Sequence, residues 1–374
     1  MTLIGSIIGL KAGDPNMNDS TTRQMTNTVT GNYFEDFKLG QQIVHATPRT
    51  VTVGDVSLFT ALYGSRFAVQ SSDAFAESIG YARAPIDDLL VFHIVIGKTV
   101  PDISRNAIAN LGYAEFRFLR PVYPGDTLAS TSEVIGVKEN SNGKNGTVYV
   151  RSTGSNQHGQ PVLSYARWVM VNKRNLGAPA PPPVVPKLAG CVDPASLGEA
   201  LPPLSLAGYD FALAGSPRRW GNYAKGEKID HVDGQTIEEA EHQLATRLFQ
   251  NTARVHFNQH VEGKGRFGRR LVYGGHIISI ARSLSFNGLA NAFHILGLNG
   301  ARHVAPSFAG DTIYAWSEVL EKAELPGRSD MGALRLRTFA VKDRSGADFA
   351  GISADGSHEE GVVLDMDYWA ALPR

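Results

Sequence analysis

Residues 117–128 read RFLRPVYPGDTL, and residues 302–313 read RHVAPSFAGDTI. The two stretches share an arginine, a proline and a Gly-Asp-Thr triplet in the same order, at a constant shift of 185 positions. The triplet Ser132-Glu133-Val134 recurs as Ser317-Glu318-Val319 at that same shift. A constant shift between separated matches indicates that the chain contains two copies of one folding unit.

The repeat also extends toward the start of each copy. Residues 38–45 (KLGQQIVH) lie over residues 224–231 (AKGEKIDH) at a shift of 186, which aligns His45 with His231. A histidine present in both copies favours a shared structural role over catalysis. Asp126 and Asp311 each follow a glycine at the entry of an expected strand, where we expect them to accept hydrogen bonds from local backbone amides.

Each copy has the same order of expected elements. A capped helical pattern ends at Tyr63 or Phe249, and a longer apolar segment follows that suits a buried helix, at residues 89–100 and 276–289. Strands are then expected in the first copy, with Asn-Gly turn signals at 142–143 and 145–146. One long helix followed by antiparallel strands predicts an α+β unit in which a sheet wraps a central helix, duplicated. The expected strands cover residues 115–118, 127–138, 147–155 and 162–171.

Composition and charge bound the function. The 374 residues include 36 Lys plus Arg and 36 Asp plus Glu, so no excess positive charge is present to bind nucleic acid or an anionic membrane. The single cysteine, Cys191, cannot form an internal disulfide, which suits a cytoplasmic location. The apolar run at residues 3–10 is too short for a membrane helix and has no basic residue ahead of it, so we expect neither a membrane anchor nor a secretory signal.

Proline and polar stretches divide the chain. The segment at residues 178–186 holds five prolines and reads as an extended spacer. We predict a loose tail at residues 1–31, a first unit at 32–175, a Pro-rich linker at 176–215 and a second unit at 216–374.

With these motifs in place, the chain resembles the MaoC-like hydratases of the hot-dog superfamily. Stretches of the first half resemble more narrowly the mesaconyl-CoA hydratases, also called β-methylmalyl-CoA dehydratases. The resemblance implies a tandem (double) hot-dog fold whose halves pair their sheets within the chain, and a possible homodimer. It also implies hydration of a CoA thioester, with CoA as part of the substrate and no metal or redox cofactor. The narrower matches are residues 31–37, 84–93, 98–104 and 138–144.

The resemblance also implies an active-site loop of the pattern Gly-Asp-x-Asn-Pro-x-His. Residues 250–256 of the second copy (QNTARVH) keep the histidine, His256, and replace the aspartate with Asn251. Residues 64–70 of the first copy (GSRFAVQ) keep neither group. We therefore predict that His256 is the general acid/base and that the first half supports the fold and holds the acyl group.

Asn251 cannot take up a proton at neutral pH, so the two-group mechanism of the family does not transfer unchanged. Either His256 performs both proton transfers through one water, or a carboxylate comes from elsewhere. Asp87 and Asp88 are candidates because they align with the residues before the family's central helix. Their alternative role is to cap that helix.

Further candidates surround the aligned loop. Backbone amides at the start of a helix carry partial positive charge, so Gly275, with Gly274 beside it, is the expected donor to the thioester oxygen. Arg254 could bind the free carboxylate of a dicarboxylic acyl group. A basic cluster at residues 264–270 could meet the CoA phosphates or could be a solvated loop. His93 is expected to be a core histidine, and no residue spacing indicates a metal site.

The expected function is reversible hydration of an enoyl-CoA, with mesaconyl-CoA as the first candidate substrate. One alternative is a hydratase or thioesterase that acts on another acyl-CoA. A second alternative, encouraged by the missing aspartate, is an acyl-CoA binding protein without catalysis.

Overall fold

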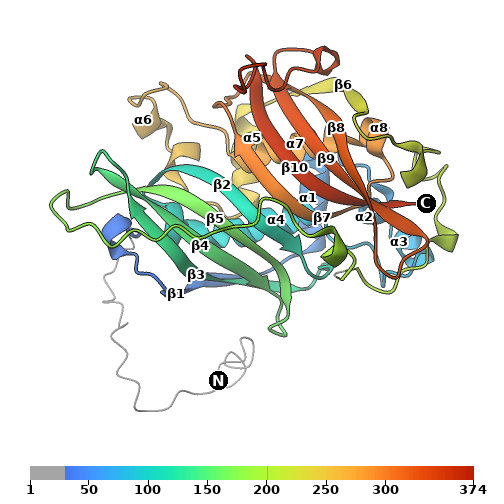
Figure 1. Ribbon diagram of the computed structural model, residues 1–374, viewed down its shortest axis with the longest axis horizontal. Helices are drawn as coiled ribbons and strands as arrows, with labels where there is room; N and C mark the ends of the chain where they lie inside the picture. Colours follow the sequence, from blue (N-terminus) through green and yellow to red (C-terminus); the bar gives the residue numbers. More distant parts are fainter. Residues whose placement is uncertain (1–29, 200) are drawn as a thin grey trace.

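Ten strands form one antiparallel sheet in the computed structural model, which describes residues 30–199 and 201–374. The strand order is β1-β3-β4-β5-β2-β7-β10-β9-β8-β6, so the first five strands of the chain make one half and the last five make the other (Figure 1). The strands are β1 (Gln42–Thr50), β2 (Ala107–Phe118), β3 (Thr127–Glu139), β4 (Asn145–Ser155), β5 (Pro161–Asn172), β6 (Lys228–Thr236), β7 (His294–His303), β8 (Thr312–Glu324), β9 (Met331–Lys342) and β10 (Val362–Pro373).

The two halves repeat one topology in opposite directions from the centre of the sheet. β1 to β5 correspond in order to β6 to β10, and β2 pairs with β7 where the halves meet, through Phe116 with Leu298 and Arg117 with Gly297. The predicted double hot-dog fold with sheets paired within the chain is therefore confirmed. The halves share one apolar core, because a single cluster of buried side chains includes residues from both.

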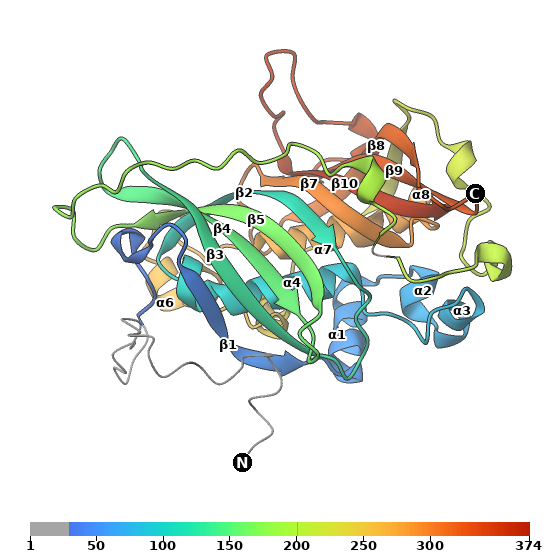
Figure 2. The same cartoon turned by 60° about the horizontal axis from the view of Figure 1, so that its bottom comes forward.

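One long helix in each half lies against the sheet (Figure 2). These helices are α4 (Asp88–Thr99) and α7 (Gly274–Leu284), and they correspond to the predicted buried segments. The helix α1 (Val53–Tyr63) forms where predicted because Thr52 and Asp55 make reciprocal capping hydrogen bonds. The other helices are α2 (Ala68–Ser71), α3 (Asp73–Ser78), α5 (Glu239–Leu248), α6 (Gln259–Glu262), α8 (Phe286–Leu289) and the 3-10 turn η6 (Arg254–His256).

Some predicted boundaries were wrong. The predicted helix at residues 276–289 is not continuous, because α7 ends at Leu284 and the backbone of Asn287 and Gly288 within α8 is not helical. Asn142-Gly143 makes the β3–β4 turn, with Gly143 in the left-handed region, but Asn145-Gly146 begins β4. A Cβ on Gly146 would meet the ring of Phe34, so this glycine serves packing and not the turn.

The predicted linker at residues 176–215 packs against the sheet. Val184 bridges to Val137 of β3, and Val192 donates its backbone N–H to the Asn299 side chain at 2.7 Å. Figure 1 shows the segment crossing the strands of the first half. It is extended, as its prolines predict, but residues such as Leu197 are buried. The domain boundaries stay a prediction, and residues 1–29 of the predicted tail lie outside the described residues.

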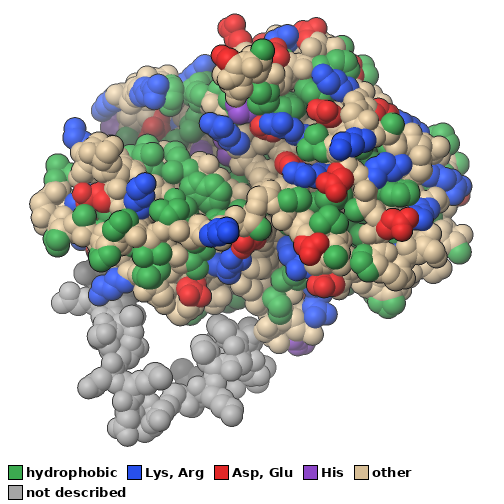
Figure 3. Space-filling model, in the orientation of Figure 1, with side chains coloured by type: hydrophobic (Ala, Val, Ile, Leu, Met, Phe, Trp, Pro, Cys, Tyr) green, Lys and Arg blue, Asp and Glu red, His purple; other side chains and the backbone are tan. Residues whose placement is uncertain are grey.

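The surface is mixed in charge. Figure 3 shows basic and acidic side chains interspersed over the face that it presents. Over the described residues, no helix is both long and apolar enough to cross a membrane. The predicted cytoplasmic location and homodimer stay predictions.

Candidate active site

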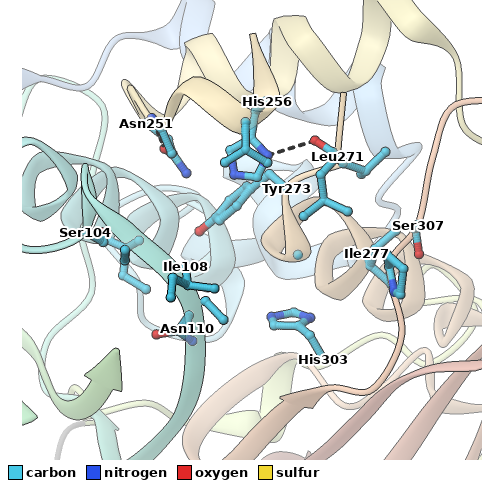
Figure 4. A pocket seen from close by; sticks show the side chains of 18 of the residues that line it. Ser104, Ile108, Asn110, Asn251, His256, Leu271, Tyr273, Ile277, His303 and Ser307 are labelled. Atoms are coloured by element: carbon cyan, nitrogen blue, oxygen red, sulfur yellow. Dashed lines mark hydrogen bonds between the residues drawn. The ribbon is translucent and has the colours of Figure 1, made fainter. Parts of the chain in front are cut away.

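A pocket of about 350 Å³ lies between the two halves (Figure 4). The first half contributes the end of α4, the start of β2 and one residue of β5. The second half contributes the loops before and after α6, the start of α7, the end of β7 with the segment after it, and one residue of β10. The lining residues are Ile96, Val100, Ser104, Ala107, Ile108, Ala109, Asn110, Tyr113 and Arg167 from the first half, and Asn251, Ala253, Val255, His256, Phe267, Leu271, Val272, Tyr273, Gly274, Ile277, His303, Val304, Ala305, Pro306, Ser307 and Val363 from the second.

His256 is held in one orientation at this pocket. Its Nδ1 lies 2.8 Å from the backbone oxygen of Leu271, and because a carbonyl only accepts, Nδ1 carries the proton and Nε2 keeps its lone pair. Burial lowers the pKa of His256 to about 4, so the ring is neutral near pH 7. The side chain can therefore accept a proton at Nε2.

Asn251 lies beside His256 on the same loop (Figure 4). Its Oδ1 accepts a hydrogen bond from the backbone N–H of Ala253 at 2.9 Å, which directs the Nδ2 donors elsewhere. The preceding Gln250 has φ of +53°, and its repeat counterpart Gly64 has φ of +61°. The loop thus leaves the helix in the same left-handed conformation in both copies, although only the second copy carries the histidine.

The first turn of α7 forms another wall. Gly274 lines the pocket and packs against the ring of His303, which lies across the pocket from His256 (Figure 4). Gly275 does not line the pocket, since a Cβ there would meet the rings of Tyr273 and His93. Of the two glycines predicted near the thioester oxygen, the structure places Gly274 at the pocket and Gly275 behind it.

Three predicted residues lie away from this pocket. Arg254 is exposed, because the tight η6 turn directs His256 inward and Arg254 outward. Asp87 caps α4 by accepting from the backbone N–H of Leu89 at 2.9 Å. Asp88 pairs with His294 at 2.8 Å. The capping alternative therefore holds for Asp87, and neither aspartate reaches His256 as a lining residue.

Polar lining residues that the sequence reasoning missed include Arg167, Asn110, His303 and Ser307. Arg167 was detectable, because it falls in phase with buried residues of β5 in an otherwise apolar strand face. His303 stands within the quoted repeat at the position of Phe118, which is a change from a core aromatic to a titratable ring. No such signal distinguishes Asn110 or Ser307.

The repeated histidines have the shared structural role that was predicted. Nε2 of His45 lies 2.8 Å from Ser132, and Nε2 of His231 lies 2.8 Å from Ser317. His93 is fully buried, as expected, and lies 2.9 Å from Ser279 of the other half.

The local bonds predicted for the two aspartates also form. Asp126 accepts from the backbone N–H of Tyr123, and Asp311 from that of Phe308. In the described part of the chain, no group of three or more His, Cys, Asp or Glu residues is arranged to hold a metal ion.

Comparisons with known proteins show the family of the chain. The chain is 64% identical over 347 residues to the "Beta-methylmalyl-CoA dehydratase" of Chloroflexus aurantiacus, covering 93% of this chain and 98% of that protein. It is 59% identical over 350 residues to the "Mesaconyl-CoA hydratase" of Cereibacter sphaeroides, covering 93% of this chain and 99% of that protein.

Solved structures show the same fold. The crystal structure of a MaoC domain protein dehydratase from Chloroflexus aurantiacus, 64% identical, superposes with a TM-score of 0.91 and covers 93% of this chain and 99% of its own. A Mycobacterium tuberculosis protein described as having a double hotdog fold is 26% identical and superposes with a TM-score of 0.69. The match covers 93% of this chain and 100% of that protein. The family model for mesaconyl-CoA hydratase matches residues 12–354. The chain therefore belongs to the mesaconyl-CoA hydratase family, within the MaoC-like proteins of double hot-dog fold.

Proposed function

We propose that this chain is a hydro-lyase that catalyses the reversible hydration of mesaconyl-CoA to β-methylmalyl-CoA. The observation that carries this proposal is His256, which is neutral and oriented with Nε2 free to accept a proton in a pocket between the halves. Family membership supports the choice of substrate. The reaction needs no cofactor beyond the CoA of its substrate.

The pocket offers a path for the thioester. Ile108 and Phe267 line it and are 54% and 42% exposed, so they mark its open side. The acyl group enters there, and its thioester oxygen faces the first turn of α7 at Gly274. Partial positive charge at this helix start stabilises the negative charge that develops on the oxygen as water adds.

The proton transfers then centre on His256. Nε2 takes a proton from a water whose oxygen forms a bond to the β-carbon, while the double-bond electrons move toward the thioester. The Nδ2 donors of Asn251 orient that water. No Asp or Glu is among the described residues that line the pocket, so the imidazolium returns the same proton to the α-carbon. The net change is addition of one water, and His256 ends neutral.

The test is to incubate the purified chain with mesaconyl-CoA and follow loss of the enoyl absorbance and formation of the hydrated product. We expect turnover without release of free thiol, and His256→Ala should lower kcat by at least ~1000-fold while acyl-CoA binding persists. Release of thiol would instead identify a thioesterase. Binding without any turnover by the unmodified chain would identify an acyl-CoA binding protein.

A further inference from the structure

Arg167 presents an unused positive charge to the pocket. Its side chain is only 3% exposed, on the face of β5 that points toward α4. One terminal nitrogen donates to Thr99 Oγ1 at 2.7 Å and reaches Ser104 Oγ at 3.5 Å. Within the described residues, Nε has no hydrogen-bond partner and the guanidinium makes no ion pair. A guanidinium has five N–H donors, so most of its capacity remains open.

The described side chains that Arg167 contacts are neutral. The charge of Arg167 acts to lower the pKa of three nearby phenols, those of Tyr113, Tyr165 and Tyr273. Burial has the larger effect and raises the pKa of all three. They therefore remain neutral at physiological pH. Thr99 and Ser104 are also neutral, and the described pocket lining holds no carboxylate. A buried charge without a partner is costly and is retained where a ligand supplies the opposite charge.

The internal repeat shows that the fold does not need an arginine here. Arg167 pairs across the sheet with Tyr113, and the residue at the same place in the second half is Tyr368, which pairs with Leu298. Tyr113 and Leu298 are separated by the repeat shift of 185. Because Tyr368 is fully buried in an equivalent strand, the position accepts a neutral side chain. The arginine is thus a feature of the pocket and not of the architecture.

We propose that Arg167 binds the free carboxylate of the substrate and sets the preference of the enzyme for a dicarboxylic acyl group. This inference rests on the proposed function. In mesaconyl-CoA the free carboxylate is attached to the β-carbon that the water attacks, so it must lie near His256. Arg167 and His256 line the same pocket from opposite halves, as such a short acyl group requires. The guanidinium can bind a carboxylate through two N–H groups and so fix its orientation.

Two other orphaned polar groups lie in the same pocket. Both side-chain atoms of Asn110 and the hydroxyl of Ser307 are buried without a hydrogen-bond partner in the described structure. A carboxylate has about four lone-pair sites, which is more than one guanidinium uses. The Nδ2 group of Asn110 is the second donor that we assign to the carboxylate, because it comes from β2, which pairs with β5.

The experiment compares mesaconyl-CoA with tiglyl-CoA, in which a methyl group replaces the carboxylate and the rest of the acyl group is unchanged. For Arg167→Met in the full chain, we expect kcat/KM for mesaconyl-CoA to fall at least ~1000-fold and kcat/KM for tiglyl-CoA to change less than ~5-fold. Arg167→Lys keeps the charge but lacks the paired N–H donors. Its kcat/KM for mesaconyl-CoA should therefore lie between the values of the unmodified chain and of Arg167→Met. Arg254→Met removes an exposed arginine beside His256 and should alter neither value more than ~3-fold.

A binding measurement separates this inference from the proposed function. The unmodified chain should bind succinyl-CoA more tightly than butyryl-CoA, and Arg167→Met should abolish that difference, whether or not the chain hydrates mesaconyl-CoA. The assignment would be overturned if kcat/KM fell equally for mesaconyl-CoA and tiglyl-CoA in an Arg167→Met protein with a native melting temperature. An unchanged succinyl-CoA preference would also overturn it. If Arg167→Met does not fold, Arg167→Lys and Asn110→Ala provide the same comparison.

Discussion

The two polar residues of the active-site loop have different capacities. His256 can carry a proton, whereas Asn251 can only donate and accept hydrogen bonds. An amide also adds no negative charge to the pocket, which under our proposal admits a carboxylate beside Arg167. The replacement of the expected acid by Asn251 is therefore consistent with a dicarboxylic substrate, since a second anion at this place would repel it.

A negative charge introduced by Asn251→Asp should repel the carboxylate of the substrate. The carboxylate can keep the bond to the Ala253 N–H, but its charge opposes the substrate carboxylate and raises the pKa of His256. We expect kcat/KM for mesaconyl-CoA to fall ~100-fold and the preference for mesaconyl-CoA over tiglyl-CoA to fall at least ~10-fold. Steady-state kinetics with both substrates measure this. Thr252→Asp adds the same charge at an exposed neighbour as a control, and an equal effect there would refute the explanation.

At the scale of single residues, the sequence predicts which residues lie near the pocket better than it predicts which way their side chains point. The comparison with the family's loop pattern pointed to His256 and Asn251, and both line the pocket. It also suggested Arg254 for the carboxylate, but spacing along a loop does not tell which way a side chain points, and Arg254 faces outward. The alternation of side chains along a strand does show which face each one lies on. Arg167 could therefore have been found from its phase within residues 161–172.

The elements that carry the loop are held by a close contact between the halves. Gly97 in α4 packs against the backbone at Phe249 and lies near the backbone nitrogen of Asn251. A helix of the first half therefore positions the loop of the second half that carries Asn251 and His256. The predicted bounds of the capped helices and of α4 were nearly right, but their sequence patterns hold no sign of this contact.

The contact predicts that Gly97→Ala impairs catalysis without touching the pocket. Its Cβ would overlap the carbonyl of Phe249, so α4 or the loop must shift. We expect kcat to fall at least ~10-fold and the melting temperature to drop by several degrees, for a cost of about 1–3 kcal/mol. In Gly54→Ala on α1, the new Cβ would meet only Thr52 Oγ1 at 3.5 Å. That variant should retain kcat, and full activity in Gly97→Ala would contradict the positioning role.

The strand β2 shows why some elements escape prediction. Its sequence pattern predicts only residues 115–118, but the strand begins at Ala107. Register shifts between Ala107 and Ala109, and again between Asn110 and Gly112, break the alternation of buried and exposed side chains. The irregular part of β2 is also the part that lines the pocket. The site thus lies where the strand departs from the regular pattern that sequence reading relies on.

On the scale of the whole molecule, duplication provides two equivalent places, and the described pocket lies at the one whose loop carries His256. The loop of the first copy is packed against the second half. Gln70 donates to the backbone oxygen of Phe293 at 2.7 Å, and the guanidinium of Arg282 lies 3.8 Å from the ring centroid of Phe67. We therefore infer one active site per chain, with its walls drawn from both halves. Neither half has a complete site alone.

The shared core also holds several uncharged histidines, which couples stability to pH. Burial lowers the folded-state pKa to about 3 for His93 and His276 and to about 4 for His231, His256 and His303. In the unfolded chain each would titrate near ~6.5. Below that pH the unfolded state binds protons that the folded state excludes, so the free energy of unfolding falls as the pH drops from about 6.5 toward 4.

The melting temperature should therefore be level above pH ~7 and fall increasingly steeply below pH ~6.5, because each such histidine contributes up to about 1.4 kcal/mol per pH unit. Thermal unfolding followed from pH 8 to pH 5 measures this. In His276→Asn the amide oxygen can still accept from the Tyr63 hydroxyl, which lies 2.9 Å from Nδ1 of His276, but it cannot titrate. This variant should show a shallower acid slope, whereas His260→Asn at an exposed position should keep the original one. A melting temperature that stays level down to pH 5, or an identical slope in all three proteins, would show that the buried histidines do not govern acid stability.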